Sequence, residues 1–302
     1  METDWNTAFN RANTGAASVI ANSAANAAAG TFGNGEIRGG LSGNFGAVDL
    51  GVVNMNGLGT FLTGQPFGTA IGGGYGSVTR VDAAGGAVRS DNSVKYTSPT
   101  FSGLNVTLYK ANKQTKGANA SDNFSSTFAR TDLAGSQEVG VNYANGPIAA
   151  SFSSLKQDFT DVESTSGTTG VTKSTVNTLG ANYTMGAAKF FLLNQTNKNT
   201  GAATTATTVD TKFTSVSATY AIGATTLMAQ VGELKADAGT YAGKKSKLTG
   251  LGADYALSKR TALYARYESI DDKAGVVAIT GFTAATGNDK RTRTAFGLRH
   301  SF

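Results

Sequence analysis

The chain has 302 residues, with 39 Gly, 3 Pro, no Cys and a formal net charge of +6. The absence of Cys excludes disulfide scaffolds and thiolate metal sites, and abundant Gly with scarce Pro excludes collagen and proline-rich disorder. Lys and Arg are scattered apart from the short run GKKSK, so the positive charge is typical of solvated loops and we expect no nucleic-acid partner.

Short stretches in which apolar side chains take every second position run along the chain. GEIRGGLSG turns through NFGA into VDLGVVN, and a long glycine-rich segment follows. VRSDNSVKYTS turns through PTFSG into LNVTLYKAN, and a polar stretch follows. Alternation of this kind predicts β-strands, each pair joined by a tight turn and followed by a long loop.

The same rhythm continues to the end of the chain. EVGVNY turns at Asn145 and Gly146 into IAASFSSLKQ, NTLGANYT turns at MGAA into KFFLLNQT, and FTSVSATY turns at AIGA into TTLMAQVGEL. TGLGADY turns at ALSK into RTALYARYESI, and a last long loop leads to RTRTAFGLRHSF. Short turns that alternate with long loops are typical of outer-membrane β-barrels, whose short turns are periplasmic.

Several apolar stripes end in Tyr immediately before a tight turn: Tyr143, Tyr183, Tyr220 and Tyr255. Aromatic side chains at one height are typical of a girdle at a membrane interface. No apolar run reaches the roughly 18 residues that a transmembrane helix needs. Because backbone groups in hydrocarbon must all be paired, we predict an all-β fold, a transmembrane antiparallel up-and-down β-barrel in the bacterial outer membrane.

Four longer motifs carry a resemblance to a known family: GLSGNFGAVDLG, RSDNSVKYTSPTFSGLNV, GADYALSKRTALYARYE and the terminal AFGLRHSF. With them the chain resembles the general diffusion porins of Gram-negative bacteria, in particular the trimeric sixteen-stranded porins of beta-proteobacteria. It departs from that family at LGVVN, where Val52 stands in place of the pore-lining Arg of a common LGRQ motif. The resemblance implies a homotrimer in contact with outer-membrane lipid and lipopolysaccharide.

Counting strands backwards from the C-terminus gives about thirteen, plus the stub METDW, of the expected sixteen. Single-chain bacterial barrels have even strand numbers, and no signal peptide precedes the first strand. Both observations predict a fragment of a porin that lacks its N-terminal strands. A naturally smaller barrel with another closure is the alternative.

The resemblance also implies an inward-folded constriction loop within a single barrel domain, 1–302. The matching segment is 54–86, which has no acidic residue before Asp82 and carries Arg80. Its glycines allow close backbone packing against the inner wall. We therefore expect a neutral to basic loop inside the barrel.

Strand alternation assigns charged side chains to the inside of the barrel, because Val94, Tyr96 and Ala265 are expected on the outside. The wall residues predicted to line the pore are Glu36, Arg38, Arg89, Asp91, Lys95, Arg266, Glu268, Arg293 and Arg299. Bases outnumber acids in this set, and fixed positive charge in a narrow pore favours anions. The alternative is that each Arg forms a salt bridge with a neighbouring acid, such as Arg89 with Asp91 or Arg266 with Glu268, with little effect on permeation.

We predict a water-filled channel for passive diffusion of small hydrophilic solutes, including anions, with weak to moderate anion preference and no cofactor. Catalysis is not expected, because the single His, His300, faces outwards on the last strand and no His-dependent triad or zinc site can form inside. The alternatives are a surface adhesin rich in Gly, Asn and Thr, and a substrate-specific channel such as a sugar porin.

The last strand places Phe296, Leu298, His300 and Phe302 on its outer face. In the family that the chain resembles, such a strand is the signal read by the outer-membrane barrel-assembly machinery. The resemblance therefore implies this machinery as a partner and these four residues as the signal.

Overall fold

The structure, a computed structural model, describes residues 2–3, 36–79, 88–112, 133–159, 171–201, 210–238, 242–272 and 290–301. Its strands form a single sheet in chain order, in which neighbours are antiparallel. Within the described residues the fourteen strands are β1 (Glu2–Thr3), β2 (Ile37–Gly43), β3 (Gly46–Asn54), β4 (Arg89–Thr97), β5 (Leu104–Ala111), β6 (Leu133–Asn145), β7 (Ile148–Phe159), β8 (Val171–Met185), β9 (Ala188–Gly201), β10 (Thr211–Ile222), β11 (Thr225–Ala236), β12 (Lys245–Ala256), β13 (Thr261–Asp271) and β14 (Lys290–His300). This up-and-down order confirms the predicted fold class, and β2 to β14 together with the short β1 in METDW confirm the strand count.

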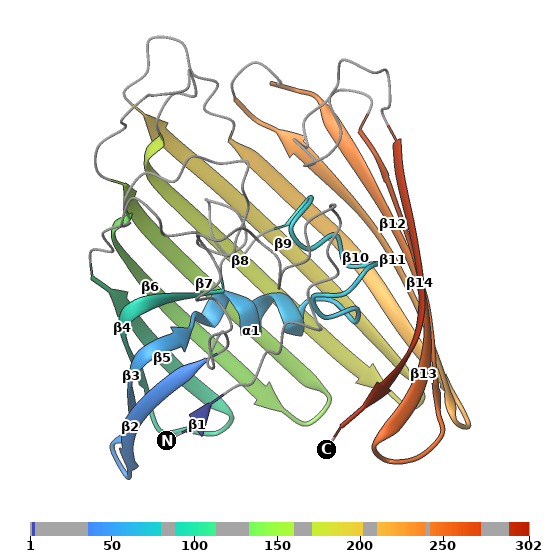
Figure 1. Ribbon diagram of the computed structural model, residues 1–302, viewed down its shortest axis with the longest axis horizontal. Coiled ribbons are helices and arrows are strands. Elements are labelled where there is room, and N and C mark those ends of the chain that lie inside the picture. The colour runs from blue at the N-terminus through green and yellow to red at the C-terminus, as the bar shows by residue number, and fades with distance from the viewer. Residues whose placement is uncertain are drawn as a thin grey trace, which may run out of the picture.

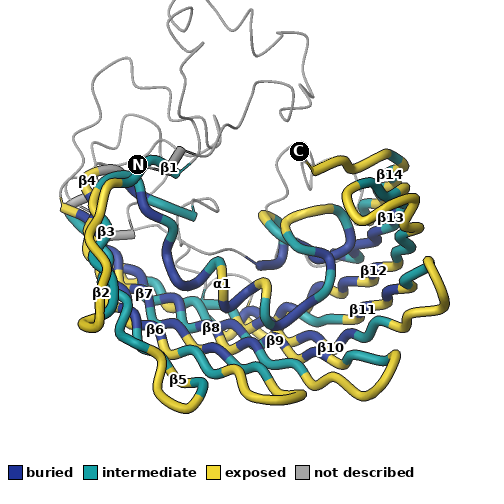
Figure 2. The backbone as a smooth tube through the Cα atoms, turned by 90° about the horizontal axis from the view of Figure 1, so that it is seen from below, coloured by how far each residue is buried: buried dark blue, intermediate teal, exposed yellow. Residues whose placement is uncertain are grey.

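The sheet is tilted and curved like a barrel wall. Figure 1 shows the strands slanting across the molecule, and Figure 2 shows them following an arc from β2 to β14. Among the described residues β1 pairs only with β2 and β14 only with β13, so the described sheet is an open trough. Its concave side holds α1 (Asn56–Thr63) and the chain that follows this helix (Figure 2).

Alternation along the strands separates an apolar outer face from a more polar inner face. On β10 the side chains of Val216 and Tyr220 are exposed, whereas those of Ser215 and Ser217 are buried. The outer face of β12 repeats the pattern with exposed Leu251. Exposed apolar side chains of this kind are stabilised by lipid, so the outer face is that of a membrane barrel.

The tight turns lie where the sequence predicts them. Gly146, Gly186 and Gly223 have φ of 56°, 58° and 56°, a left-handed backbone that favours glycine. Each begins a short connection, from β6 to β7, from β8 to β9 and from β10 to β11. Two-residue turns with positive φ match the twist of the strands that they join.

The sequence pattern does not predict α1, which contains Gly57 and Gly59 among its 8 residues. Gly is a poor helix former, so contacts with the wall must stabilise this helix. No helix in the described part of the chain is long and apolar enough to span a bilayer.

Two apolar clusters lie between the wall and residues 55–79, which we call the inward segment. In one cluster Phe61 of α1 packs with Leu193 and Phe213 of the wall. In the other, Met55 packs with Leu155. The inner wall is therefore apolar where the inward segment covers it, and burial of these side chains fixes the segment on the concave face.

Candidate functional site

The inward segment begins at the N-terminus of α1, where a wall carboxylate binds it. Glu138 on β6 is buried, and its carboxylate oxygens accept hydrogen bonds from the backbone N–H groups of Asn56 at 2.5 Å and Gly57 at 2.7 Å. The N-cap residue, Met55, makes no side-chain capping bond. Because a negative charge here also interacts favourably with the helix dipole, Glu138 serves as the cap from a distant strand.

The body of α1 contacts β7 and β8. Thr60 Oγ1 and Ser151 Oγ lie 2.6 Å apart, and the Asn182 side-chain amide donates to the Thr63 carbonyl at 2.8 Å. Gly180 permits this close approach, because a Cβ at this position would lie 2.1 Å from the Thr60 carbonyl oxygen. The helix is thus packed directly on the wall.

A second buried carboxylate binds the far part of the inward segment. Glu268 on β13 is only 1% exposed, and it accepts hydrogen bonds from the N–H groups of Gly72 and Gly74, both at 3.1 Å. Gly250 on β12 allows the contact, because a Cβ there would lie 2.1 Å from the Gly72 carbonyl oxygen. The inward segment therefore crosses the concave face from β6 to β13, with one wall carboxylate bound to each part.

Two arginines of β14 compensate the charge of Glu268. Arg293 Nη2 lies 2.5 Å and Arg291 Nη2 lies 3.3 Å from Glu268 Oε1. Arg291 also donates to the Ser77 hydroxyl of the inward segment. The Arg293 side chain is 36% exposed whereas Glu268 is 1% exposed, so the positive partner is the one that faces open space.

Arg266 of β13 is buried rather than directed into open space. Its guanidinium lies 2.7 Å from Asp254 Oδ1, and it is stacked 5.9 Å from the centroid of the Phe67 ring. Arg299 lies 3.7 Å from the other Asp254 oxygen, and its side chain is 67% exposed. Of these two arginines, only Arg299 presents its charge to solvent.

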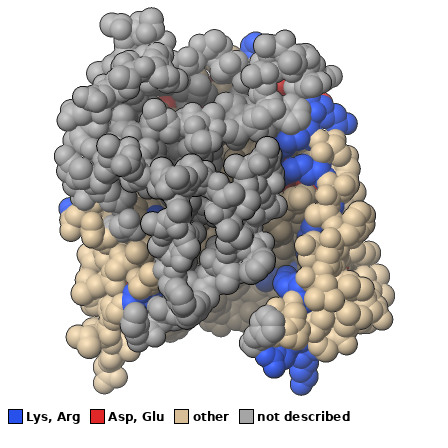
Figure 3. Space-filling view, viewed as in Figure 1, with Lys and Arg blue, Asp and Glu red and all other residues tan. Residues whose placement is uncertain are grey.

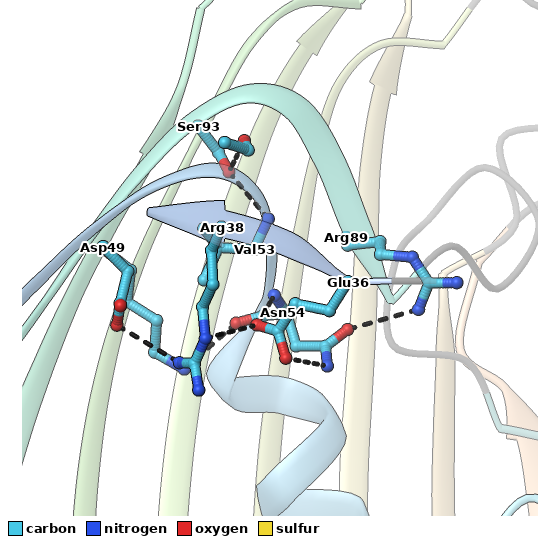
Figure 4. A network of polar contacts seen from close by, with 9 residues as sticks. Glu36, Arg38, Asp49, Val53, Asn54, Arg89 and Ser93 are labelled. Carbon is cyan, nitrogen blue, oxygen red and sulfur yellow. Dashed lines mark hydrogen bonds and ion pairs between the residues drawn. The ribbon is translucent and has the colours of Figure 1, made fainter. Parts of the chain in front are cut away.

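A further charged cluster lies where β3 runs into the inward segment (Figure 4). Arg38 Nη1 lies 3.3 Å from Asp49 Oδ2, and Glu36 accepts hydrogen bonds from the backbone and side-chain nitrogens of Asn54 at 3.0 and 3.1 Å. Lys95 Nζ donates to the Asn54 carbonyl at 3.0 Å. Acids and bases therefore alternate around the end of β3.

A β-bulge brings these side chains together. The register between β3 and β4 shifts between Gly51 and Val53, where Ser93 Oγ donates to the Gly51 carbonyl at 2.8 Å and accepts from the Val53 N–H at 3.2 Å. Bulges bend a strand, and this one directs the end of β3 towards the concave side. Arg89 then donates to the Asn54 side-chain oxygen at 3.4 Å (Figure 4).

The structure brings most of the predicted pore residues into two groups. Glu36, Arg38, Arg89 and Lys95 surround Asn54, and Arg266, Glu268, Arg293 and Arg299 lie on β13 and β14. Arg80, Asp82 and Phe302 lie outside the described residues, and Asp91 is described only as part of the β4 backbone.

The suggested salt bridge between Arg266 and Glu268 is wrong. Glu268 lies directly opposite Arg293 in the register of β13 and β14, and Arg266 binds Asp254 of β12. Cross-strand neighbours are closer to each other than residues two apart along one strand, so each charge finds its partner on a neighbouring strand. Arg89 donates a hydrogen bond to the side chain of Asn54.

Sequence reasoning missed four charged residues of the site: Asp49, Glu138, Asp254 and Arg291. Strand alternation could have found them, since each of the four residues alternates with outward-facing residues of its strand and therefore faces inwards. For example, Glu138 precedes Val139, which is exposed on the outer face. Which of these charges bind the inward segment could not be read from parity, because that depends on contacts between distant parts of the chain.

The last strand exposes its even-numbered side chains. Phe296 and Leu298 are among the exposed large apolar residues, and His300 is exposed with its Nδ1 at 2.8 Å from Thr261 Oγ1. Phe296, Leu298 and His300 therefore lie on the outer face of β14, apart from the charged groups of the concave side.

A tilted, curved antiparallel sheet with an apolar outer face, and with a chain segment bound across its concave face, defines a β-barrel channel of the outer membrane. The family model for Gram-negative porins matches residues 6–275, and the chain belongs to this family. Porins are channels rather than enzymes, and membership places the chain in the bacterial outer membrane and favours a channel over a surface adhesin.

Solved outer-membrane proteins share the fold. An anion-selective porin from Comamonas acidovorans has a TM-score of 0.69 at 23% identity, over 91% of this chain and 80% of that chain. OmpT, an outer membrane protein of Vibrio cholerae, has a TM-score of 0.60 at 17% identity, over 86% of this chain and 78% of its own. OmpT in its trimer form has a TM-score of 0.57 at 19% identity, over 77% of this chain and 68% of that chain. No curated protein sequence matches the chain.

Proposed function

We propose that the chain forms a water-filled channel through which small hydrophilic solutes diffuse passively across the outer membrane. The observation that carries this proposal is the inward segment, which crosses the concave face and is bound by Glu138 and Glu268. A segment fixed there narrows the space that the wall encloses. Residues 54–86 would thus be the constriction of a single barrel domain, 1–302.

We further infer a weak to moderate preference for anions. On the wall formed by β12, β13 and β14 the acids Glu268 and Asp254 are covered, at 1% and 17% side-chain exposure, whereas Arg293 and Arg299 reach open space. Figure 3 shows basic side chains at the side of the molecule where β12 to β14 lie, with little acidic surface beside them. Fixed positive charge lowers the barrier for anions. The anion selectivity of the Comamonas acidovorans porin supports the same preference here.

Planar bilayer recording tests the anion preference. In a KCl gradient the reversal potential of the reconstituted chain should have the sign of chloride permeation. Arg293→Gln should reduce this potential, because the exposed charge is lost. Arg260→Gln, which removes an exposed Arg from the β12–β13 turn, serves as the matched control and should leave it unchanged. A reversal potential with the sign of potassium permeation would contradict the proposal.

We also propose a homotrimer embedded in outer-membrane lipid and lipopolysaccharide. The trimer form of OmpT from Vibrio cholerae supports this assembly. The exposed outer face of β14, with Phe296 and Leu298, supports recognition of the last strand by the barrel-assembly machinery. A heat-modifiable trimer band in detergent is expected, and a monomer that stays soluble without detergent would contradict the membrane assembly.

A further inference from the structure

Three lysines lie directly opposite one another on the outer face of the sheet. Lys212 of β10 is the register partner of Lys235 of β11, and Lys235 is the register partner of Lys245 of β12. All three side chains are exposed, Lys235 by 48% and Lys245 by 51%. We call Lys212, Lys235 and Lys245 the lysine row. Lys198 and Lys247, also exposed, flank it on β9 and β12.

Like charges directly opposite each other destabilise a sheet, so the lysine row needs negative charge nearby. Carboxylates supply part of it, since Lys235 lies 3.1 Å from Asp237 and Lys245 lies 2.8 Å from Glu233. Such exposed ion pairs contribute little. Lys212 forms no ion pair with any residue that the structure describes. The row therefore retains the capacity to bind an external anion.

The height of the lysine row indicates which anion is available. Lys212 and Tyr220 are 8 residues apart on β10, which is about 26 Å along a strand and about 20 Å of height at a tilt of about 40°. Tyr220 lies beside the tight turn, with exposed Val216 between it and the row. Because the apolar band of such barrels is about 25 Å tall, the lysine row lies near its upper boundary, on the side of the long loops.

The two boundaries of the outer face therefore differ. At the tight turns the boundary carries Tyr183, Tyr220 and Tyr255, all exposed, and at the other boundary β10 to β12 carry lysines. Aromatic rings suit a zwitterionic interface, whereas a row of ammonium groups suits a leaflet rich in phosphate.

We propose that the lysine row binds the phosphate groups of lipid A, the glycolipid anchor of lipopolysaccharide, in the outer leaflet. This proposal rests on the proposed function only for the orientation of the barrel in the membrane, with the long loops outside the cell. Three ammonium groups on adjacent strands present a compact positive surface that spans two interstrand spacings, about 10 Å. A glycolipid with two phosphates can contact several of them at once, which single inorganic phosphate ions cannot do.

Native mass spectrometry of the purified full chain in detergent tests the site, with lipid A carrying two phosphates as the probe. The variant Lys212→Gln/Lys235→Gln/Lys245→Gln should bind about 100-fold more weakly, because each Lys near an anionic lipid contributes about fivefold. The control Lys189→Gln/Lys259→Gln/Arg260→Gln loses the same charge beside the tight turns, at the opposite boundary, and should bind like the wild type. The variant Lys212→Arg/Lys235→Arg/Lys245→Arg keeps the positive charge and should still bind lipid A. If the triple variant does not fold, Lys212→Gln alone should show about a fivefold loss.

Three results would overturn the proposal: binding by the folded variant within twofold of the wild type, equal binding of dephosphorylated lipid A, or displacement of lipid A by inorganic phosphate at equal concentration. The last result would assign the row to free anions. Conductance of the lysine-row variants in lipid bilayers should not change, since the row lies outside the channel. A wild type without conductance would contradict the proposed function and leave the lipid result to stand by itself.

Discussion

Glu138 and Glu268 both bind the inward segment, but their charges are compensated differently. Glu138 depends mainly on the segment, through the N–H groups of Asn56 and Gly57, together with Ser153 and the more distant Lys95 on the wall. No base in the described part of the chain lies within salt-bridge distance of it. Glu268 has Arg291 and Arg293 on the neighbouring strand. If the segment left the wall, Glu138 would lose the two N–H groups that bind its charge, whereas Glu268 would keep both arginines. The α1 end should therefore be the more tightly held of the two.

The largest effect is expected when Glu268 loses its charge. Glu268→Gln leaves Arg291 and Arg293 without their counterion, and breaking a buried charge pair by removing one partner costs about 3 kcal/mol. The folded barrel should unfold at lower temperature or lower denaturant concentration. Glu233→Gln, which removes an exposed carboxylate, is the control and should have almost no effect. Equal stability of the two variants would show that the β14 arginines do not need Glu268.

A smaller and more local effect is expected at Glu138. Glu138→Gln can accept one N–H bond well but loses the charge that interacts with the helix dipole, which costs about 1–2 kcal/mol. Hydrogen exchange should become faster at the amides of α1 and stay unchanged in β13. Faster exchange at Gly72 and Gly74 than at Asn56 and Gly57 in the wild type would agree with the tighter α1 end. The reverse order would contradict the difference between the two carboxylates.

A pair of glycine substitutions separates packing from helix propensity. Gly180→Ala places a Cβ against the Thr60 carbonyl and should displace α1 from the wall, at a cost of about 1–2 kcal/mol. Gly59→Ala adds the same methyl group to α1 where nothing lies within 4 Å, and it should stabilise the helix by up to about 1 kcal/mol. Amide hydrogen exchange in α1 should become faster in Gly180→Ala and slower in Gly59→Ala. Similar changes in both variants would show that α1 does not rest on β8.

The fold could be predicted from the sequence because strands of a membrane barrel are largely defined by local rules. Alternation fixed which side of β10 carries Val216 and which carries Ser215, and turn residues such as Gly146 and Gly223 fixed where strands reverse. The family motifs and this rhythm together were sufficient for the strand order. Neither depends on contacts between distant residues.

The site could be predicted only in part, because parity gives the face of a residue and not its partner. Alternation directed Arg266 and Glu268 inwards, but the register of β12, β13 and β14 decided that they bind Asp254 and Arg293. The helix α1 escaped prediction for a related reason. Its glycines oppose it locally, and its N-terminal cap comes from Glu138, 82 residues away in sequence.

The central claim is that the inward segment is fixed on the concave face. A designed disulfide tests this claim most directly. The chain has no Cys, and the side-chain oxygens of Thr60 and Ser151 are 2.6 Å apart, close to the geometry of a disulfide. In Thr60→Cys/Ser151→Cys we predict complete crosslinking under mild oxidation, with the conductance of the wild-type channel retained before and after reduction. Failure to crosslink in the folded protein, or a large change in conductance when the bond forms, would contradict the account.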